Sequence, residues 1–94
     1  MSFLEEKIDY YNKPLPPLKS FVLPGGTPLS SHLHQARAVV RRAERTICIL
    51  KDTESVNECV LHYTNRLSDL LFVLARFSNH QADGDVLWVP GAYR

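Results

Sequence analysis

The chain has 94 residues, which is enough for one small domain. A domain of this size buries about 65% of its unfolded surface, so its core is thin. The 45% hydrophobic and 22% charged residues are ordinary for a globular protein and argue against disorder, collagen or a simple coiled coil. A net charge of +1 provides no broad field for nucleic acid or an anionic membrane.

Neither a membrane span nor a signal peptide is expected. The longest apolar run, Leu70 to Ala75, is too short to cross a bilayer, and the N-terminus lacks an apolar stretch. Cys48 and Cys59 form no CxxC pair, which predicts reduced thiols and a cytoplasmic protein.

The first elements are short. Apolar residues on one face predict a helix over residues 1–12. Closely spaced prolines and the Gly25–Gly26 pair predict a loop over residues 13–28.

A long helix is expected from Thr27 to about Leu50, with Thr27 as N-cap and Pro28 at the first helical position. A second is expected from Ser55, which forms a capping box with Glu58, to about Asn79. Each has an apolar stripe with alternating four- and three-residue spacing. The stripes are Leu29, Leu33, Ala36, Val40, Ala43, Ile47, Leu50 and Val56, Val60, Tyr63, Leu67, Leu70, Leu74, Phe77.

The short link at residues 51–54 makes the two helices antiparallel neighbours, so the predicted fold is all-α, a long helical hairpin. Residues 81–94 form a tail whose apolar side chains around Trp88 we expect to be covered. The run from Leu70 to Ala75 is apolar all round its helix, more than one neighbouring helix can bury. Other subunits or further segments would complete the bundle.

A polar strip borders each apolar stripe. Its members are His34, Arg37, Arg41, Glu44 and Cys48 on the first helix, and His62, Asn65, Arg66, Asp69 and Arg76 on the second. Arg42 and Arg45 add positive charge. A solvated face with ion pairs one turn apart is one interpretation. Bunched arginines beside acceptors at a buried seam instead favour a polyanion, with triphosphate the obvious candidate.

Other signals are weak. His32 and His34 form an HxH pair without further ligand spacing, and Gly25–Gly26 precedes a helix N-terminus that could approach a phosphate. No Walker sequence, GxGxxG, nucleophile elbow or HExxH is present. The aromatic residues are too scattered to indicate nucleic-acid binding.

Four motifs in order resemble the ATP:cob(I)alamin adenosyltransferases of the propanediol-utilisation type. They are Phe21-Val-Leu-Pro-Gly-Gly-Thr27, Leu33-His-x-Ala-Arg37, Arg41-Arg-Ala-Glu-Arg45 and Asn65-Arg-Leu-Ser-Asp69-x-Leu-Phe72-x-x-Ala-Arg76. The resemblance implies a trimer of five-helix bundles with sites between subunits. It also implies transfer of the 5′-deoxyadenosyl group of ATP to cob(I)alamin, with release of triphosphate and with magnesium on the nucleotide.

The resemblance also implies residue roles. The catalytic set would be Arg37, Arg41, Glu44 and Asp69, and the ATP contacts Arg37, Arg41, Glu44, Arg45, Asn65 and Arg66. Phe21 would face the corrinoid and help exclude its lower axial ligand, and this chain would supply no metal ligand.

One departure is large. The N-terminal half of the family, with its glycine-rich phosphate loop, has no counterpart in this sequence. Residues 1–94 would be a single domain, the C-terminal part of such an enzyme, either truncated or one half of a split enzyme with a separate N-terminal polypeptide. The alternative is a non-catalytic oligomeric helical module that binds corrinoid or nucleotide.

Overall fold

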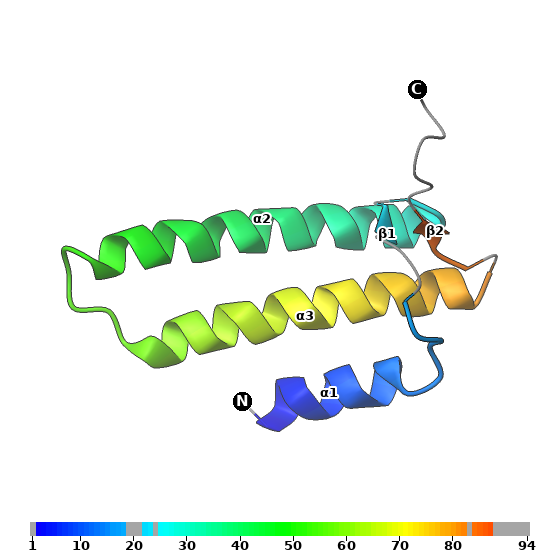
Figure 1. Ribbon diagram of the computed structural model, residues 1–94, viewed down its shortest axis with the longest axis horizontal. Coiled ribbons are helices and arrows are strands. Elements are labelled where there is room, and N and C mark those ends of the chain that lie inside the picture. The colour runs from blue at the N-terminus through cyan, green and yellow to red at the C-terminus, as the bar shows by residue number, and fades with distance from the viewer. Residues whose placement is uncertain (1, 19–21, 24, 83, 88–94) are drawn as a thin grey trace.

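The computed structural model describes residues 2–18, 22–23, 25–82 and 84–87. The elements are α1 (Ser2–Asn12), β1 (Val22–Leu23), α2 (Pro28–Lys51), α3 (Glu58–His80) and β2 (Val86–Leu87). The all-α prediction is confirmed: α2 and α3 form the long antiparallel hairpin, and the strands are only two residues each (Figure 1). No helix in the described part of the chain is long and apolar enough to cross a membrane.

The start of α2 is as predicted. Thr27 is the N-cap, and its hydroxyl oxygen accepts a hydrogen bond from the Ser30 N–H at 3.0 Å. Pro28 occupies the first helical position, where its missing N–H costs nothing.

The predicted start of α3 is wrong. The helix begins at Glu58, three residues after Ser55, and Asn57 is its N-cap, accepting from the Cys59 N–H at 2.8 Å. Asn caps a helix as well as Ser does. The Thr53 and Glu54 N–H groups donate to the Leu50 carbonyl and close the turn that ends α2. Glu58 pairs across the turn with Lys51 at 2.9 Å instead of completing a capping box.

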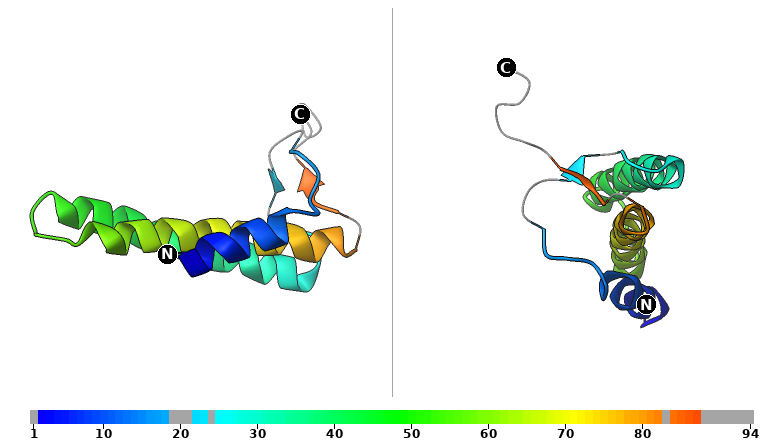
Figure 2. Two further views of the ribbon diagram at one scale, coloured as in Figure 1. Left: turned by 90° about the horizontal axis from the view of Figure 1, so that it is seen from below. Right: turned by 90° about the vertical axis from the view of Figure 1, so that its right-hand side faces the viewer.

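α3 is the middle of three helices, with α2 on one side and α1 on the other (Figure 2). The Tyr11 and Phe77 rings meet edge to face at 5.1 Å between α1 and α3. Two neighbours explain how an all-round apolar helix is accommodated: Val73 and Ala75 are buried, whereas Leu70, Leu71, Phe72 and Leu74 are only half-buried.

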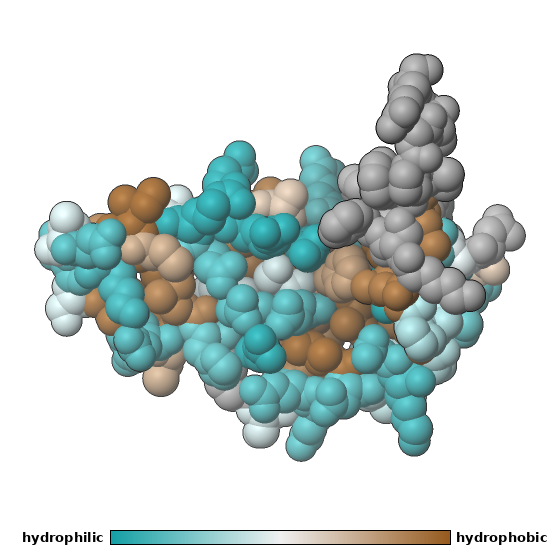
Figure 3. Space-filling model, viewed as in Figure 1, coloured by the Kyte–Doolittle hydropathy of each residue, from teal (hydrophilic) through white to brown (hydrophobic). Residues whose placement is uncertain are grey.

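The predicted apolar stripes are incompletely covered at their ends. Leu29, Leu50, Val60 and Tyr63 are exposed, as are Val39 and Ile49 outside the stripes, with Ile49 at 72%. Apolar surface shows at several places on this face, among them the end of the hairpin far from the strands (Figure 3). A single helical neighbour shields only one side of α2, so these side chains stay in solvent unless something else covers them.

At the opposite end of the hairpin the loop and the tail meet. β1 and β2 pair antiparallel, with Val22 opposite Leu87 and Leu23 opposite Val86 (Figure 1). The tail pairs with the loop through β2, but the expected covering of its apolar side chains is not seen at Leu87, which is exposed. Trp88 lies outside the described residues. Polar side chains dominate the buried set here, with Ser30, Arg76 and Asn79 all buried.

Candidate functional site

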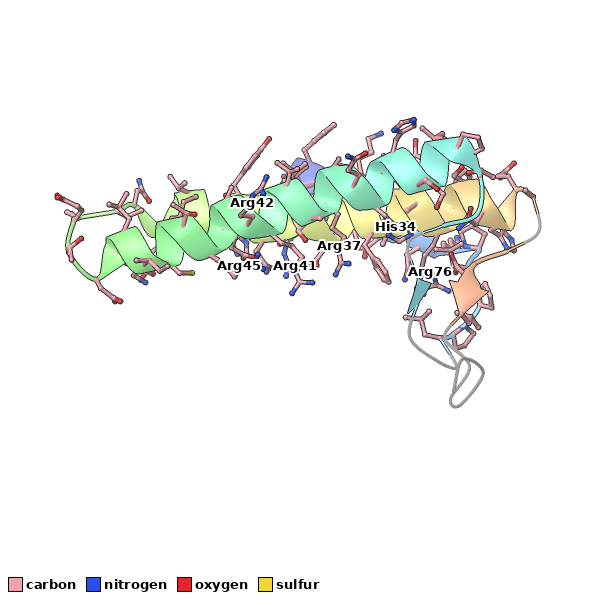
Figure 4. The ribbon with its side chains drawn as sticks, turned by 90° about the horizontal axis from the view of Figure 1, so that it is seen from above. His34, Arg37, Arg41, Arg42, Arg45 and Arg76 are labelled. Atoms are coloured by element: carbon pink, nitrogen blue, oxygen red, sulfur yellow. The ribbon has the colours of Figure 1, made fainter. Side chains whose placement is uncertain are left out.

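The arginines of α2 fall on two edges of the helix. Arg37, Arg41 and Arg45 project from one edge together with His34, and Arg42 projects from the opposite edge (Figure 4). The spacing of four residues keeps the first three on one side, whereas Arg42 is turned away by a single residue step. We call Arg37, Arg41 and Arg45 the arginine edge.

A chain of hydrogen bonds crosses from α2 to α3 beside this edge. Asn65 Nδ2 donates to Glu44 Oε2 at 3.1 Å, and Arg66 Nη2 donates to Asn65 Oδ1 at 2.7 Å. The same Nη2 lies 3.0 Å from Asp69 Oδ2. Four of the residues predicted for the site therefore meet in one network. Within it, the Asn65 side chain is held through both its amide nitrogen and its amide oxygen.

Arg37 is half-buried and held by an aromatic ring. Its Cζ lies 4.6 Å from the centroid of Phe72, a cation–π distance. Its Nε is buried with no hydrogen-bond partner among the described residues. Burial is the main cause that lowers the pKa of Arg37, followed by the nearby charge of Arg41, with Asp69 acting in the opposite direction. The guanidinium remains charged. Its positive charge is therefore available to an anionic group of a ligand.

Arg41 and Arg45 are exposed. Within the described part of the chain, no carboxylate lies within 4.0 Å of either. Glu44, the obvious intrahelical partner, accepts from Asn65 instead. The interpretation of this face as a set of ion pairs one turn apart therefore fails for these arginines, and the arginine edge carries uncompensated positive charge.

The two histidines of the HxH pair separate, because residues two apart point to different sides of a helix. His32 is exposed, whereas His34 is buried with its ring 6.2 Å from Phe72 and its Nε2 without a hydrogen-bond partner. Burial and then Arg37 lower the pKa of His34, partly opposed by Asp85. Among residues 2–18, 22–23, 25–82 and 84–87, no group of three or more metal-ligating side chains comes together.

Two functional candidates were missed from the sequence. Arg76 was placed on the polar strip without a role, and Asn79 was noted only as a helix end. The structure buries both, at 6% and 0% exposed, and gives each of them partners in the loop and the tail. The spacing of three residues places both on one helix face, but nothing in the sequence pairs either of them with the loop. Phe21, the predicted corrinoid contact, lies outside the described residues.

Comparison with known proteins agrees with this geometry. The sequence model of the family described as cobalamin adenosyltransferase matches residues 1–78. A corrinoid adenosyltransferase of Mycobacterium tuberculosis is 58% identical over 93 residues, covering 97% of this chain and 47% of the relative. One from Bacillus subtilis is 49% identical over 87 residues, covering 92% of this chain and 45% of the relative.

Solved structures show the same fold. A PduO-type ATP:corrinoid adenosyltransferase from Lactobacillus reuteri, a phenylalanine-to-alanine variant complexed with cobalamin and ATP, is 48% identical with a TM-score of 0.85. The match covers 93% of this chain and 49% of that one. The chain thus spans about half the length of the relatives it matches. It belongs to the cobalamin adenosyltransferase family.

Proposed function

We propose that this chain is the C-terminal part of an ATP:corrinoid adenosyltransferase and supplies one wall of its ATP and corrinoid site. The observation that carries the proposal is the arginine edge, three guanidinium groups beside an ordered Glu44–Asn65–Arg66–Asp69 network. Relatives of this family have been solved with ATP, or with cobalamin and ATP. A triphosphate is the anion that such a row of forked donors suits.

In the proposed reaction the electron pair of Co(I) forms a bond to C5′ of ATP. The C5′–O bond breaks, and its electron pair leaves with the triphosphate. The arginine edge stabilises the charge that builds up on this leaving group. Arg37 is already fixed by the Phe72 ring, so it needs little reordering as the charge develops.

The network has a different role. The nitrogen and the oxygen of the Asn65 side-chain amide each already make one hydrogen bond. The remaining proton on Nδ2 and the remaining lone pair on Oδ1 are left for a ligand. We assign Asn65 to nucleotide contact, with Glu44, Arg66 and Asp69 ordering it. Asp69 also faces Arg37 electrostatically and thereby ties the network to the arginine edge.

Magnesium would accompany the nucleotide as its counter-ion. The residues at the arginine edge do not fit a protein-held divalent cation, because guanidinium groups repel it and the nearby carboxylates are engaged by Asn65 and Arg66.

We assign Phe21 to the corrinoid side of the site and propose a homotrimer completed by an N-terminal half. Exposed Leu29, Ile49 and Leu50 support such covering, because exposed apolar side chains gain free energy on burial. The two cysteines are free and exposed, which supports a reducing, cytoplasmic setting.

The test is ATP titration of the Arg41→Ala variant, with Arg42→Ala as a matched control. Both changes remove one exposed guanidinium from α2, but only Arg41 lies on the arginine edge. We expect the dissociation constant for ATP to rise about tenfold or more for Arg41→Ala and less than about twofold for Arg42→Ala. Equal effects would contradict the assignment of the arginine edge. A wild-type chain that binds nucleotide but transfers nothing, even with the N-terminal half, would favour the non-catalytic module.

A further inference from the structure

Asn79, in the last turn of α3, is fully buried and holds the turn that precedes α2. Its Oδ1 accepts from the Thr27 N–H at 2.9 Å, and its Nδ2 donates to the Gly25 carbonyl at 2.9 Å. The Gly25 carbonyl also accepts from the Ser30 hydroxyl at 3.1 Å. One side chain therefore satisfies two backbone groups of a turn more than fifty positions earlier in the chain.

The turn fits closely against this amide. Gly26 has φ +102°, a conformation that side chains other than glycine rarely adopt, and a Cβ there would overlap the Asn79 side chain. The Thr27 and Ser78 hydroxyls are 2.7 Å apart beside it. In this structure the Gly25–Gly26 pair therefore allows the turn to pack closely against Asn79.

Arg76, one turn before Asn79, ties two further segments to α3. Its Nε donates to Asp85 Oδ2 at 2.8 Å, and its Nη2 donates to the Pro16 carbonyl at 2.8 Å. The Arg76 and Asp85 side chains are 7% and 11% exposed, so this ion pair is largely removed from water. Removing either partner of such a buried pair is strongly destabilising, because it leaves an unpaired buried charge.

The two residues clamp both ends of one segment. Pro16 and Gly25 bracket residues 17–24, and within that segment Val22 and Leu23 pair with the strand that follows Asp85. The backbone of Asn79 also holds the tail, since its carbonyl accepts from the Gly84 N–H at 2.7 Å. The bracketed segment includes Phe21. None of these contacts involves the arginine edge.

We propose that Asn79 and Arg76 are positioning residues for the corrinoid side of the site. They fix Pro16 and Gly25, which flank residues 17–24 in the sequence, to α3. Phe21, which the proposed function assigns to the corrinoid, belongs to that stretch of sequence. This inference rests on the proposed function. It predicts a split in kinetics: loss of the clamp weakens the use of corrinoid and leaves the use of ATP unchanged.

The experiment uses the purified chain together with a polypeptide carrying the half that its relatives have in addition. The main variant is Asn79→Asp, which keeps size but removes the donor to Gly25 and places a carboxylate beside Asp85. Arg76→Lys is the second variant, since it keeps the charge and loses the fork that reaches both Asp85 and Pro16. The control is Asn57→Ala, which removes the N-cap at the other end of α3.

Two readouts are combined: amide hydrogen exchange of Val22 and Leu23, which pair with β2, and the KM values for corrinoid and ATP in adenosyl transfer. For Asn79→Asp and Arg76→Lys we expect exchange of this segment to rise about tenfold or more. We expect the KM for corrinoid to rise about tenfold and the KM for ATP to change less than about twofold. For Asn57→Ala we expect the exchange rate and both KM values to stay near those of the wild type.

Unchanged exchange of Val22 and Leu23 in both variants would overturn the proposal that Asn79 and Arg76 hold this segment. Faster exchange with an equal rise of the two KM values would overturn its link to the corrinoid. Absence of transfer by the wild-type assembly would instead overturn the proposed function, and this inference with it.

Discussion

The guanidinium of Arg37 lies 4.6 Å from the centre of the Phe72 ring, so an arginine of α2 is stacked on an aromatic residue of α3 across the hairpin. This contact orients the charge without neutralising it. Arg37 is therefore both part of the helix packing and the best-fixed cation of the arginine edge.

Replacing Arg37 with lysine tests this orientation. Lysine keeps the charge but loses the flat group that stacks on the ring and binds phosphate with two donors. We expect the dissociation constant for ATP to rise about tenfold, with the free energy of unfolding changed by less than about 1 kcal/mol. Calorimetric titration and urea unfolding measure the two. Unaltered ATP affinity would show that the stacked guanidinium is only a packing element.

The Asn65–Glu44 hydrogen bond should be detectable as an energetic coupling. We expect Asn65→Ala and Glu44→Ala, alone and combined, to show a coupling of about 1 kcal/mol in ATP binding, because removing the Glu44 side chain frees the amide it holds. A double-mutant cycle measures it. Strict additivity would mean that the two residues act independently on the nucleotide.

His34 makes the stability of the fold depend on pH. Burial lowers the pKa of His34 in the folded chain below its usual 6.5, and Arg37 adds to the effect. The unfolded chain therefore binds a proton at higher pH than the folded chain does, and this contribution to stability is present above pH 6.5 and is lost as the pH falls from there through the lowered pKa.

Urea unfolding at a series of pH values checks this dependence. His34→Gln should flatten the curve below pH 6.5, whereas His32→Gln, at an exposed position, should leave it as in wild type. Identical curves for all three proteins would rule out His34 as the source.

Comparing Gly26 with Gly84 separates the effect of contact with Asn79 from the effect of backbone strain. Both have positive φ, but a Cβ at Gly26 meets Asn79 whereas one at Gly84 meets nothing within 4 Å. We expect Gly84→Ala to cost about 1 kcal/mol of unfolding free energy and Gly26→Ala about 3 kcal/mol, since steric overlap in a buried site adds to the backbone strain. Equal losses would indicate that Asn79 moves aside freely.

Local signals in the sequence predicted most of the fold. Thr27 and Pro28 specify the start of α2 because capping and the missing proline N–H act within one turn. The start of α3 was misplaced because Ser55 and Asn57 are both good caps, and residue type alone does not decide between them. The helical spacing also placed Arg37, Glu44, Asn65 and Asp69 on facing strips, which is where the structure has them.

The contacts of Asn79 and Arg76 with the loop could not be predicted from such local signals. Asn79 acts on Gly25 and Thr27, and Arg76 acts on Pro16, over separations of more than fifty positions that no periodicity reports. Exposure of Leu29 and Val60 was missed for a related reason: a stripe shows which face is apolar, not how many neighbours cover it.

The central claim is that this chain carries the ATP-binding wall of a corrinoid adenosyltransferase. The most direct test is adenosyl transfer with ATP, magnesium and chemically reduced cob(I)alamin, followed by the absorbance change as the carbon–cobalt bond forms. The chain is assayed alone and with a polypeptide that carries the N-terminal half of its relatives. We predict turnover in the combined assay and its loss in Arg41→Ala but not in Arg42→Ala. No turnover in either wild-type assay, or equal activity of the two variants, would contradict the account.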